Sequence, residues 1–302
     1  MNSDSSEPLE GVDPDAVAPG AVDAAELRAG LAADSPLVRQ RAVAVCDALA
    51  DADPAAVAPV LDAVATAVAD GNSAIALRAI AVFDTVAGHD PGALEGYLDP
   101  LVDRADDDIV DVQLTAATAL AKVVVARPDL VAPSLDRLIG GVRATAIDDT
   151  PEGFGEYVRD EATRQTLREH QQGERDRRTS ARRTLINVVV AVLESEAAAA
   201  VDRVDDLAGL LNDDDPAVAG GAVDGIGEIA AVDPAAVRPV RDRLIACLDH
   251  EHTVVRARAV RALGHLGDDE AVPALRRTAD GDDNEDVREV AAETAAFLAG
   301  GE

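Results

Sequence analysis

The sequence predicts an all-α protein, a right-handed α-solenoid of about six helical hairpins with a helical insertion in the middle. Two observations predict this fold. Asp53-Pro54, Asp90-Pro91 and Arg127-Pro128 recur at an interval of 37 residues, and the pair returns as Asp233-Pro234. Each pair also lies between two apolar stretches with helical spacing. A unit of helix, turn and helix with a period in this range is typical of a solenoid.

Apolar positions keep one register along the chain. Val38 corresponds to Val112, two intervals of 37 residues further on, and Ala181 corresponds in the same way to Val255. The step from Val112 to Ala181 is 69 residues, so about 32 residues are inserted between the two blocks. The next equivalent of Val255 is Val287, only 32 residues on, so the last unit is shorter.

The helices of each unit follow from composition and spacing. Alanine and leucine dominate them, and apolar residues recur at i, i+3, i+4 and i+7. Asp before Pro is expected to start each second helix, because Asp caps free amides and Pro is tolerated in the first turn. Ser35-Pro36 and Asp215-Pro216 are expected to start first helices. First helices include residues 42–50, 79–87, 117–125 and 221–230, and second helices include 56–64, 93–102, 130–138 and 236–244.

Four segments are expected along the chain. Residues 1–22 form an acidic tail, disordered through residue 12, and a degenerate N-terminal cap whose DPDAVAP echoes the DPAAVAP of residues 53–59. Residues 23–147 form the N-terminal block of repeats, and residues 148–180 form a polar, arginine-rich helical insertion. Residues 181–302 form the C-terminal block, which ends in a capping helix.

Small side chains must build the core. Aromatic residues make up only 2% of the chain and tryptophan is absent, so alanine, valine and leucine have to pack at close helix spacing. Four glycines within one predicted helix would each cost about 1 kcal/mol against alanine. They are interpreted as close-packing sites, or else as a locally weak helix: Gly220, Gly221, Gly225 and Gly227.

The charge is strongly acidic. The chain has 58 acidic and 27 basic residues, a net charge of -31, and its single lysine is Lys122. This composition resembles proteins of extreme halophiles, in which molar salt screens self-repulsion to a Debye length of about 3 Å. The alternative of an acidic disordered protein conflicts with the 48% hydrophobic content and the strict periodicity.

The sequence favours a soluble, cytoplasmic protein without a membrane segment. The N-terminus has no charged region followed by an apolar run, so no signal peptide is expected. The apolar run LINVVVAVL stops at Glu194, short of membrane-spanning length. Cys46 and Cys247 lie in separate repeats, too far apart in the array for a disulfide.

Residues 254–300 carry a specific resemblance. The helix starts Val255-Arg256 and Val287-Arg288, the helix end ALGHLG and the short second helix AVPAL resemble the HEAT-like repeats named after phycobilisome lyases. The longer N-terminal units resemble general HEAT repeats, so the resemblance covers residues 23–302 apart from the insertion. It implies a scaffold or adaptor whose second helices line a concave binding face.

Enzymatic relatives of this fold do not match these residues. Deoxyhypusine hydroxylase holds two irons with several His-Glu pairs, whereas this chain has only His250-Glu251. HEAT-like DNA glycosylases need a basic surface with aromatic residues, which argues against nucleic acid for this acidic, tryptophan-free chain. Bilin lyases leave no transferable catalytic motif here. No nucleophile triad, Walker loop or dinucleotide fingerprint appears.

A metal cluster of Cys247, His250 and His252 has the right ligand types for zinc. However, Cys247 lies within the apolar stretch LIACL, and the histidines lie in the following turn. A core cysteine beside a solvated turn is the preferred interpretation. His265 is likewise interpreted as a residue near the last carbonyls of a helix. No metal and no cofactor are therefore expected.

Arginines concentrate in a stretch that overlaps the insertion. Residues 154–183 hold eight arginines against six acids, a local reversal of charge, together with Phe154 and Tyr157. From 156 to 194 there is no proline, so one or two helices are expected, and insertions into repeats often map to a binding face. The alternative is a solvated arm with i,i+4 ion pairs. The candidate partner-binding residues here are Phe154, Tyr157, Arg164, Arg168, Arg175, Arg177 and Arg178.

A second group of candidates lies on the last second helices: Arg238, Arg241 and Arg276. If these helices line the concave side, their arginines stack into a stripe that can make paired hydrogen bonds to carboxylates of an acidic partner. The alternative is pairing within the chain, with Asp242 and Glu270.

Together these patterns predict a non-enzymatic scaffold or adaptor that binds a protein partner through the concave face, the insertion or both. A partner with an acidic segment would fit such a surface. One alternative is an accessory subunit of a lyase-type or other modifying enzyme. Another is an adaptor in a signalling or taxis complex, and the oligomeric state is left open.

Overall fold

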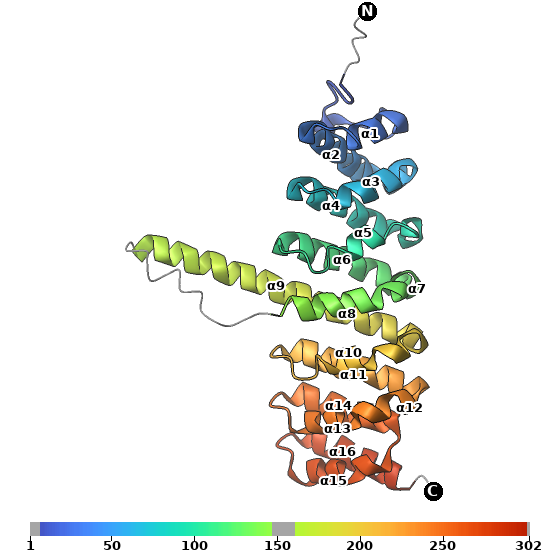
Figure 1. Ribbon diagram of the computed structural model, residues 1–302, viewed down its shortest axis with the longest axis vertical. Coiled ribbons are helices and arrows are strands. Elements are labelled where there is room, and N and C mark those ends of the chain that lie inside the picture. The colour runs from blue at the N-terminus through green and yellow to red at the C-terminus, as the bar shows by residue number, and fades with distance from the viewer. Residues whose placement is uncertain (1–6, 147–160, 301–302) are drawn as a thin grey trace, which may run out of the picture. The chain divides into compact units, whose positions relative to one another are not determined.

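A computed structural model describes residues 7–146 and 161–300, and the described residues form helices, 3-10 helices (η) and turns, without strands (Figure 1). The chain divides into two compact units. Unit 1 comprises Met1–Val131 and Ile147–Thr184, and unit 2 comprises Ala132–Ala146 and Leu185–Glu302. In each unit, pairs of helices follow one another as in an α-solenoid, so the all-α class predicted from the 37-residue interval is confirmed.

Unit 1 contains the N-terminal repeats. The first helices pack in succession, α2 against α4 and α4 against α6. The described 3-10 segments of unit 1 each begin at a proline, which cannot donate an i to i−4 bond. The elements are η1 (Pro14–Ala16), α1 (Ala24–Leu31), α2 (Pro36–Ala52), η2 (Pro54–Val60), α3 (Leu61–Val68), α4 (Ser73–His89), η3 (Pro91–Leu94), α5 (Asp99–Val102), α6 (Val110–Ala126) and α7 (Pro128–Val131).

Unit 2 contains the C-terminal repeats, in which α11 packs against α14 and α14 against α16. The last second helix, α15, has 10 residues and is not shorter than the other second helices, whereas the first helix of the 32-residue unit, α14, has 14 residues against 17 in α11. The elements of unit 2 are η4 (Ala132–Ser134), α8 (Leu135–Ala144), η6 (Ala197–Arg203), α10 (Val204–Ala208), α11 (Pro216–Val232), α12 (Pro234–Val237), η7 (Arg238–Val240), α13 (Arg241–Ala246), η8 (Cys247–Asp249), α14 (Thr253–Leu266), η9 (Asp269–Ala271), α15 (Val272–Gly281) and α16 (Glu285–Ala299).

The described part of the insertion is one end of a long helix, α9 (Glu161–Glu196). Residues up to Thr184 belong to unit 1, and those from Leu185 onward belong to unit 2. We call residues 161–180 of α9 the arm, and Figure 1 shows it projecting from the helix pairs of unit 1. The expected helical insertion therefore continues directly into the first helix of the next repeat, rather than forming a separate element.

The Asp-Pro pairs start the second helices as expected. The Asp53 side chain accepts a hydrogen bond from the Ala55 amide at 3.0 Å, and Asp90 accepts one from Gly92 at 3.1 Å. Asp233 does the same for Ala235 at 3.1 Å. Each aspartate satisfies an amide that the first turn leaves without a helical partner. The recurring pair therefore acts as a helix N-cap.

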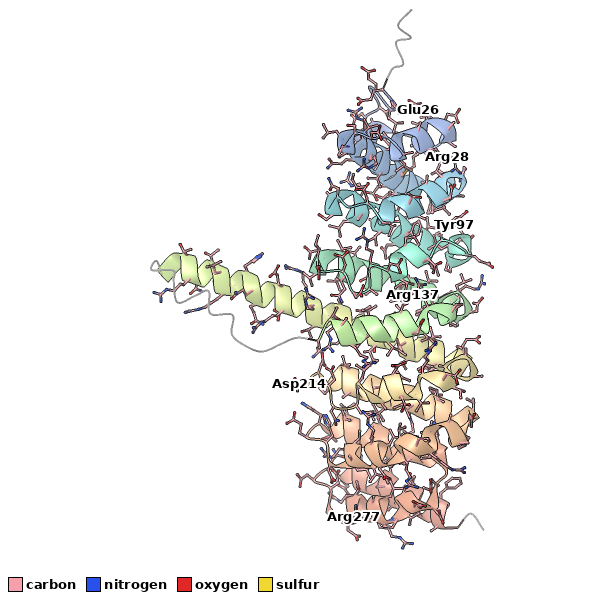
Figure 2. All side chains as sticks on the ribbon, in the orientation of Figure 1. Glu26, Arg28, Tyr97, Arg137, Asp214 and Arg277 are labelled. Carbon is pink, nitrogen blue, oxygen red and sulfur yellow. The ribbon has the colours of Figure 1, made fainter. Side chains whose placement is uncertain are left out.

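Two segments differ from the expectation. The second helix expected over 93–102 is split between η3 and α5, because the chain turns at Gly96, whose φ of 83° suits glycine. Residues 7–12, expected to be disordered, form a turn that buries Leu9 completely. The Leu9 amide donates to Glu26 Oε1 at 3.0 Å, which fixes this turn on α1 (Glu26 is labelled in Figure 2).

The glycines of α11 are close-packing sites, which is the first of the two interpretations given in the sequence analysis. A Cβ on Gly221 would lie 2.5 Å from Ile186 Cγ1, and one on Gly225 would lie 2.7 Å from Leu193 Cδ1. On the neighbouring side, a Cβ on Gly227 would lie 3.2 Å from Ala262 Cβ. The absence of side chains at these positions lets α9 and α14 approach α11 closely.

Candidate partner-binding surface

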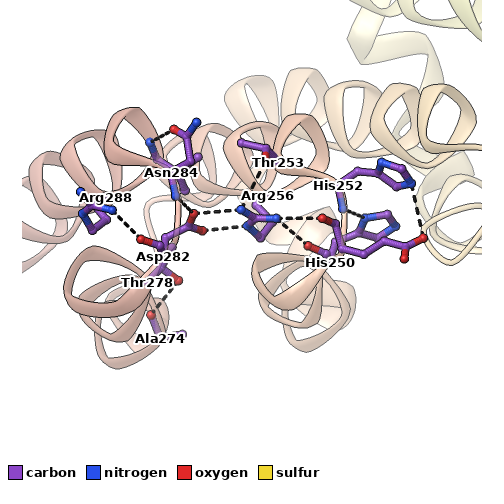
Figure 3. Close-up of polar contacts among 11 residues, drawn as sticks. His250, His252, Thr253, Arg256, Ala274, Thr278, Asp282, Asn284 and Arg288 are labelled. Carbon is purple, nitrogen blue, oxygen red and sulfur yellow. Dashed lines mark hydrogen bonds and ion pairs between the residues drawn. The ribbon is translucent and has the colours of Figure 1, made fainter.

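Two arginines on first helices are hydrogen-bonded within the chain. Arg39 and Arg256 each make paired hydrogen bonds to an aspartate in the loop before the next first helix, Asp70 and Asp282. Each arginine also donates through Nη1 to two backbone carbonyls of the loop just before its own helix. Figure 3 shows this arrangement for Arg256. The same device thus recurs at the second residue of the Val-Arg helix start in one repeat of each unit.

Asp70 and Asp282 each accept a second kind of hydrogen bond, from the backbone of their own loop. The Oδ1 atom of Asp70 accepts from the amide two residues later at 2.8 Å, and so does that of Asp282. Arginine contact lowers the pKa of both carboxyl groups, because the arginine side-chain hydrogen bonds favour their charged forms. In the repeat that begins with α11, the position of Arg39 is occupied by Ala219. The loop before the next first helix then has His250 where the other two loops have aspartate, and His250 Nδ1 accepts from the His252 amide at 3.1 Å.

Arg182 belongs to this structural group. In the repeat register it lies one residue after Ala181, as Arg39 lies after Val38. Its side chain is only 3% exposed, and it takes part in interactions within the chain. Arg182 lies in the arginine-rich stretch of residues 154–183 but beyond the insertion expected over 148–180, and the register assigns it to the repeat that follows.

The C-terminal candidates divide into paired and unpaired arginines. Arg241 contacts Asp268 at 3.2 Å, Glu270 at 2.5 Å and Asp242 at 3.1 Å. Hydrogen bonds to Asp268 and Asp242 raise the pKa of its guanidinium group. Pairing within the chain, the alternative weighed for this cluster, is therefore what the structure shows for Arg241.

Arg238 and Arg276 are exposed and have no hydrogen-bond or ion-pair partner among the described residues. Arg238 lines a cavity of about 510 Å³ with Arg241, Asp268 and Glu270, whereas Arg276 does not line it. Arg277, the next residue on α15, lines a different cavity of about 500 Å³ (Arg277 is labelled in Figure 2). The three candidates on these helices therefore do not form a single stripe of free arginines.

The arm positions its arginines differently. Arg177 Nε lies 2.9 Å from Asp111 Oδ1, and Arg178 Nη2 donates to the Asp108 carbonyl at 3.1 Å. Arg175 is half-buried and takes part in interactions within the chain. Arg164 and Arg168 have no partner among the described residues. Phe154 and Tyr157 lie outside the described residues.

Cys247, His250 and His252 were weighed as metal ligands, with a core cysteine beside a solvated turn as the preferred interpretation. Cys247 is 3% exposed, and its Sγ donates to the Arg243 carbonyl at 3.3 Å. Burial raises the pKa of the Cys247 thiol to about 11. The rings of His250 and His252 lie 5.6 Å apart. Across residues 7–146 and 161–300, no group of three or more histidine, cysteine, aspartate or glutamate side chains is arranged to hold a metal ion.

One stretch of the described chain, Thr163–Ala208, is long and apolar enough to cross a membrane by length and composition alone. It exceeds the apolar run considered in the sequence because η6 and α10 follow α9 directly along the chain. Leu185, Val189 and Leu193 in this stretch are fully buried within the protein. Such burial is typical of the core helix of a repeat.

Comparisons with known proteins support the repeat fold. The family model of HEAT repeats matches residues 204–296. The structure is similar to the crystal structure of the archaeal HEAT-like repeats protein from Thermococcus onnurineus NA1, with a TM-score of 0.53 and 12% identity over 92% of this chain and 97% of that one. This likeness concerns the fold alone.

Two further solved structures are similar at a lower level. An engineered protein has a TM-score of 0.47 and 17% identity over 81% of this chain and 96% of that one. The designed armadillo repeat protein YIII(Dq)4CqI has a TM-score of 0.37 and 16% identity over 91% of this chain and 100% of that one. No curated protein matches the sequence. The chain thus has an all-α repeat fold, and its residues 204–296 are similar to HEAT repeats.

Proposed function

We propose that this protein is a non-enzymatic scaffold or adaptor that binds a protein partner carrying an acidic segment. The arm and the second helices of the C-terminal repeats are the surfaces we assign to that partner. Proteins with HEAT and armadillo-like repeats are typically interaction scaffolds, which supports the general class. The strongly acidic composition supports action in a salt-rich cytoplasm, where charge repulsion is screened.

Unpaired arginines carry this proposal. The chain has a net charge of -31, and many of its described arginines, such as Arg39 and Arg256, are bound to its own carboxylates. Arg164, Arg168, Arg238 and Arg276 have no such partner among the described residues. An arginine that remains unpaired among so many acids is available for a carboxylate from outside the chain.

Affinity capture from a high-salt lysate tests the proposal. The full chain should retain one defined protein, and deletion of residues 150–178 or the change of Arg238 and Arg276 to glutamine should reduce its recovery. A chromophore or cofactor that co-purifies would instead support an accessory subunit of a lyase-type enzyme. Recovery of no defined protein by the full chain in salt from 0.1 to 3 M would contradict the scaffold function.

A further inference from the structure

One flank of α16 is uncovered among the described residues. In the repeat register, the fifth residue after the aligned valine near the start of a first helix packs in the core: Val223 in α11 and Val260 in α14 are fully buried. In α16 this position is Ala292, which is exposed. Ala296 is exposed as well and corresponds to Gly264, the α14 residue that faces α16. We call this side of α16 the open flank; its residues are Arg288, Glu289, Ala292, Glu293 and Ala296.

Arg288 lies on the open flank in the register position of Arg39 and Arg256. Its Nη1 atom donates to the Asp282 carbonyl at 2.7 Å, six residues back, as Arg256 Nη1 donates to the His250 carbonyl at 2.9 Å (Figure 3). In Arg39 and Arg256, the Nε and Nη2 atoms hold the aspartate of the next loop. Among the described residues, neither Nε nor Nη2 of Arg288 has an acceptor. Arg288 is thus fixed by its own loop with its aspartate-binding side open.

Glu293 of the open flank lies in the register position that Asp224 has in α11. Asp224 pairs with two arginines of the next first helix, Arg258 at 2.9 Å and Arg261 at 2.6 Å. Glu293 is exposed, and no described residue pairs with it. The open flank therefore offers one carboxylate to arginine donors and, in Arg288, one guanidinium group to a carboxylate.

We propose that the open flank binds an α-helix of a partner protein that begins with an aspartate loop and carries arginines eight and eleven residues after that aspartate. The spacing is that of this chain, in which Arg258 and Arg261 lie eight and eleven residues after His250, the residue in the aspartate position of that loop. Such a helix would place its aspartate on Arg288 and its arginines on Glu293, as consecutive first helices do within the chain. The open flank shares no residue with the arm or the second helices assigned above, so this interaction goes beyond the proposed function.

A second copy of the chain fits the open flank less well. A two-fold contact through α16 would place the same side of the helix against itself, so Glu289 and Glu293 would meet like charges. A head-to-tail contact would bring the first repeat of unit 1 to the flank, but there the aspartate position is occupied by Ala33. The small side chains of Ala292 and Ala296 instead permit close approach of a helix with complementary charges.

A pair of peptides tests the open flank. Each is fluorescein-labelled, spans residues 249–266 with His252→Asn as a helix start, and is held helical by a hydrocarbon bridge between positions 257 and 264. They differ only at position 250, where one carries His250→Asp and the other His250→Asn. Fluorescence anisotropy with the full chain in 2 M KCl should show the aspartate peptide binding at least about fivefold more tightly, because a charged carboxylate makes the stronger paired hydrogen bonds.

Variants of the full chain locate the contact. Arg288→Gln should remove the preference for the aspartate peptide, and Arg288→Lys should reduce it, since lysine cannot make the paired contact. Glu293→Gln should weaken both peptides alike, by about threefold, and retain the preference. The matched control is Arg277→Gln, which changes an exposed arginine that donates to the Pro273 carbonyl and should leave the preference unchanged. Thermal unfolding midpoints check that the variants are folded, and if Arg288→Gln lowers the midpoint, Arg288→Lys supplies the comparison.

The outcomes are decisive in both directions. Equal affinities of the two peptides for the wild-type chain, or a full preference in the Arg288 variants, would overturn the inference. So would a dimer in analytical ultracentrifugation that Arg288→Gln dissociates, because the open flank would then belong to a second copy. The peptide assay needs no partner from a lysate. Loss of the expected preference therefore leaves the scaffold function standing, and failure to capture a protein leaves the open flank standing.

Discussion

Arg256 and Asp282 form a two-point contact between consecutive first helices of unit 2. Arg256 Nε donates to Asp282 Oδ2 at 2.7 Å, and Arg256 Nη2 donates to Oδ1 at 2.9 Å. The Asp282 side chain is only 3% exposed, and its Oδ1 also accepts from the Asn284 amide at 2.8 Å. One carboxylate therefore joins the start of α14 to the start of α16.

Replacing this carboxylate should weaken unit 2. Asp282→Asn retains an acceptor for the Asn284 amide but loses the charge that pairs with Arg256. Because hydrogen bonds to charged groups contribute about 1.5–3 kcal/mol each, we expect the free energy of unfolding to fall by about 2 kcal/mol. Urea unfolding at pH 7 measures it. Asp283→Asn, which changes an exposed neighbour, is the matched control and should change the free energy of unfolding by under about 0.5 kcal/mol.

The contribution of Asp282 should depend on pH. The Arg256 side chain and the Asn284 amide hold the pKa of the Asp282 carboxyl below its ordinary value. A folded pKa below the unfolded one gives stability that is complete above about pH 4 and is lost as pH falls through the folded pKa. The difference in unfolding free energy between wild type and Asp282→Asn should therefore be largest at pH 7 and shrink below pH 4. A difference that grows in acid would contradict this account.

Two helix glycines should respond oppositely to alanine. On Gly221 a Cβ would lie 2.5 Å from Ile186 Cγ1, whereas on Gly140 it would meet nothing within 4 Å. Overpacking costs about 1–3 kcal/mol and alanine gains about 1 kcal/mol of helix propensity over glycine. We expect Gly221→Ala to lower the free energy of unfolding by about 1 kcal/mol and Gly140→Ala to raise it by up to about 1 kcal/mol, both measured by urea unfolding. Stabilisation by Gly221→Ala would show that α11 does not need this close contact.

Most helices of the repeats can be predicted from the sequence because their signals are local. Asp53 and Asp233 cap through their own side chains, and the period of apolar residues lies within each helix. The break at Gly96 was not apparent because a positive φ is a property of the backbone rather than of the hydrophobic pattern. Leu9 was assigned to a disordered tail because its burial depends on a surface formed by other helices.

Whether a given arginine is paired within the chain is harder to predict. Sequence spacing identifies Arg241 and Arg168 equally well as basic residues, but only the fold brings Asp268 and Glu270 to Arg241. The structural role of Arg182 could have been predicted, since the register that aligns Ala181 with Val38 also aligns Arg182 with Arg39. Local sequence patterns do not predict long-range ion pairs, because the partner aspartate lies in another repeat.

The acidic surface should make stability depend on salt. At a net charge of -31, self-repulsion is screened over about 3 Å in 1 M salt but over about 10 Å in 0.1 M salt. We expect the thermal unfolding midpoint to fall by on the order of 10 °C between 2 M and 0.1 M KCl, which corresponds to about 3 kcal/mol. Circular dichroism at 222 nm measures the midpoint. Sucrose of equal osmolality is the control, and an equal rise in sucrose would show that ion screening is not the cause.

The buried Leu9 should stabilise the N-terminal end of unit 1. Leu9 is fully buried, and its side chain would lie 3.0 Å from a Cβ on Gly30, so it covers α1 where that helix meets α2. Leu9→Ala removes a buried side chain at a cost of about 2–5 kcal/mol, and because repeats contact only their neighbours, the loss should remain local. Hydrogen exchange of α1 and α2 should accelerate while that of α14 stays unchanged. The control is Leu37→Ala, which truncates a leucine that is 73% exposed. Equal acceleration in both variants, or acceleration in α14, would show that Leu9 does not act as a local cap.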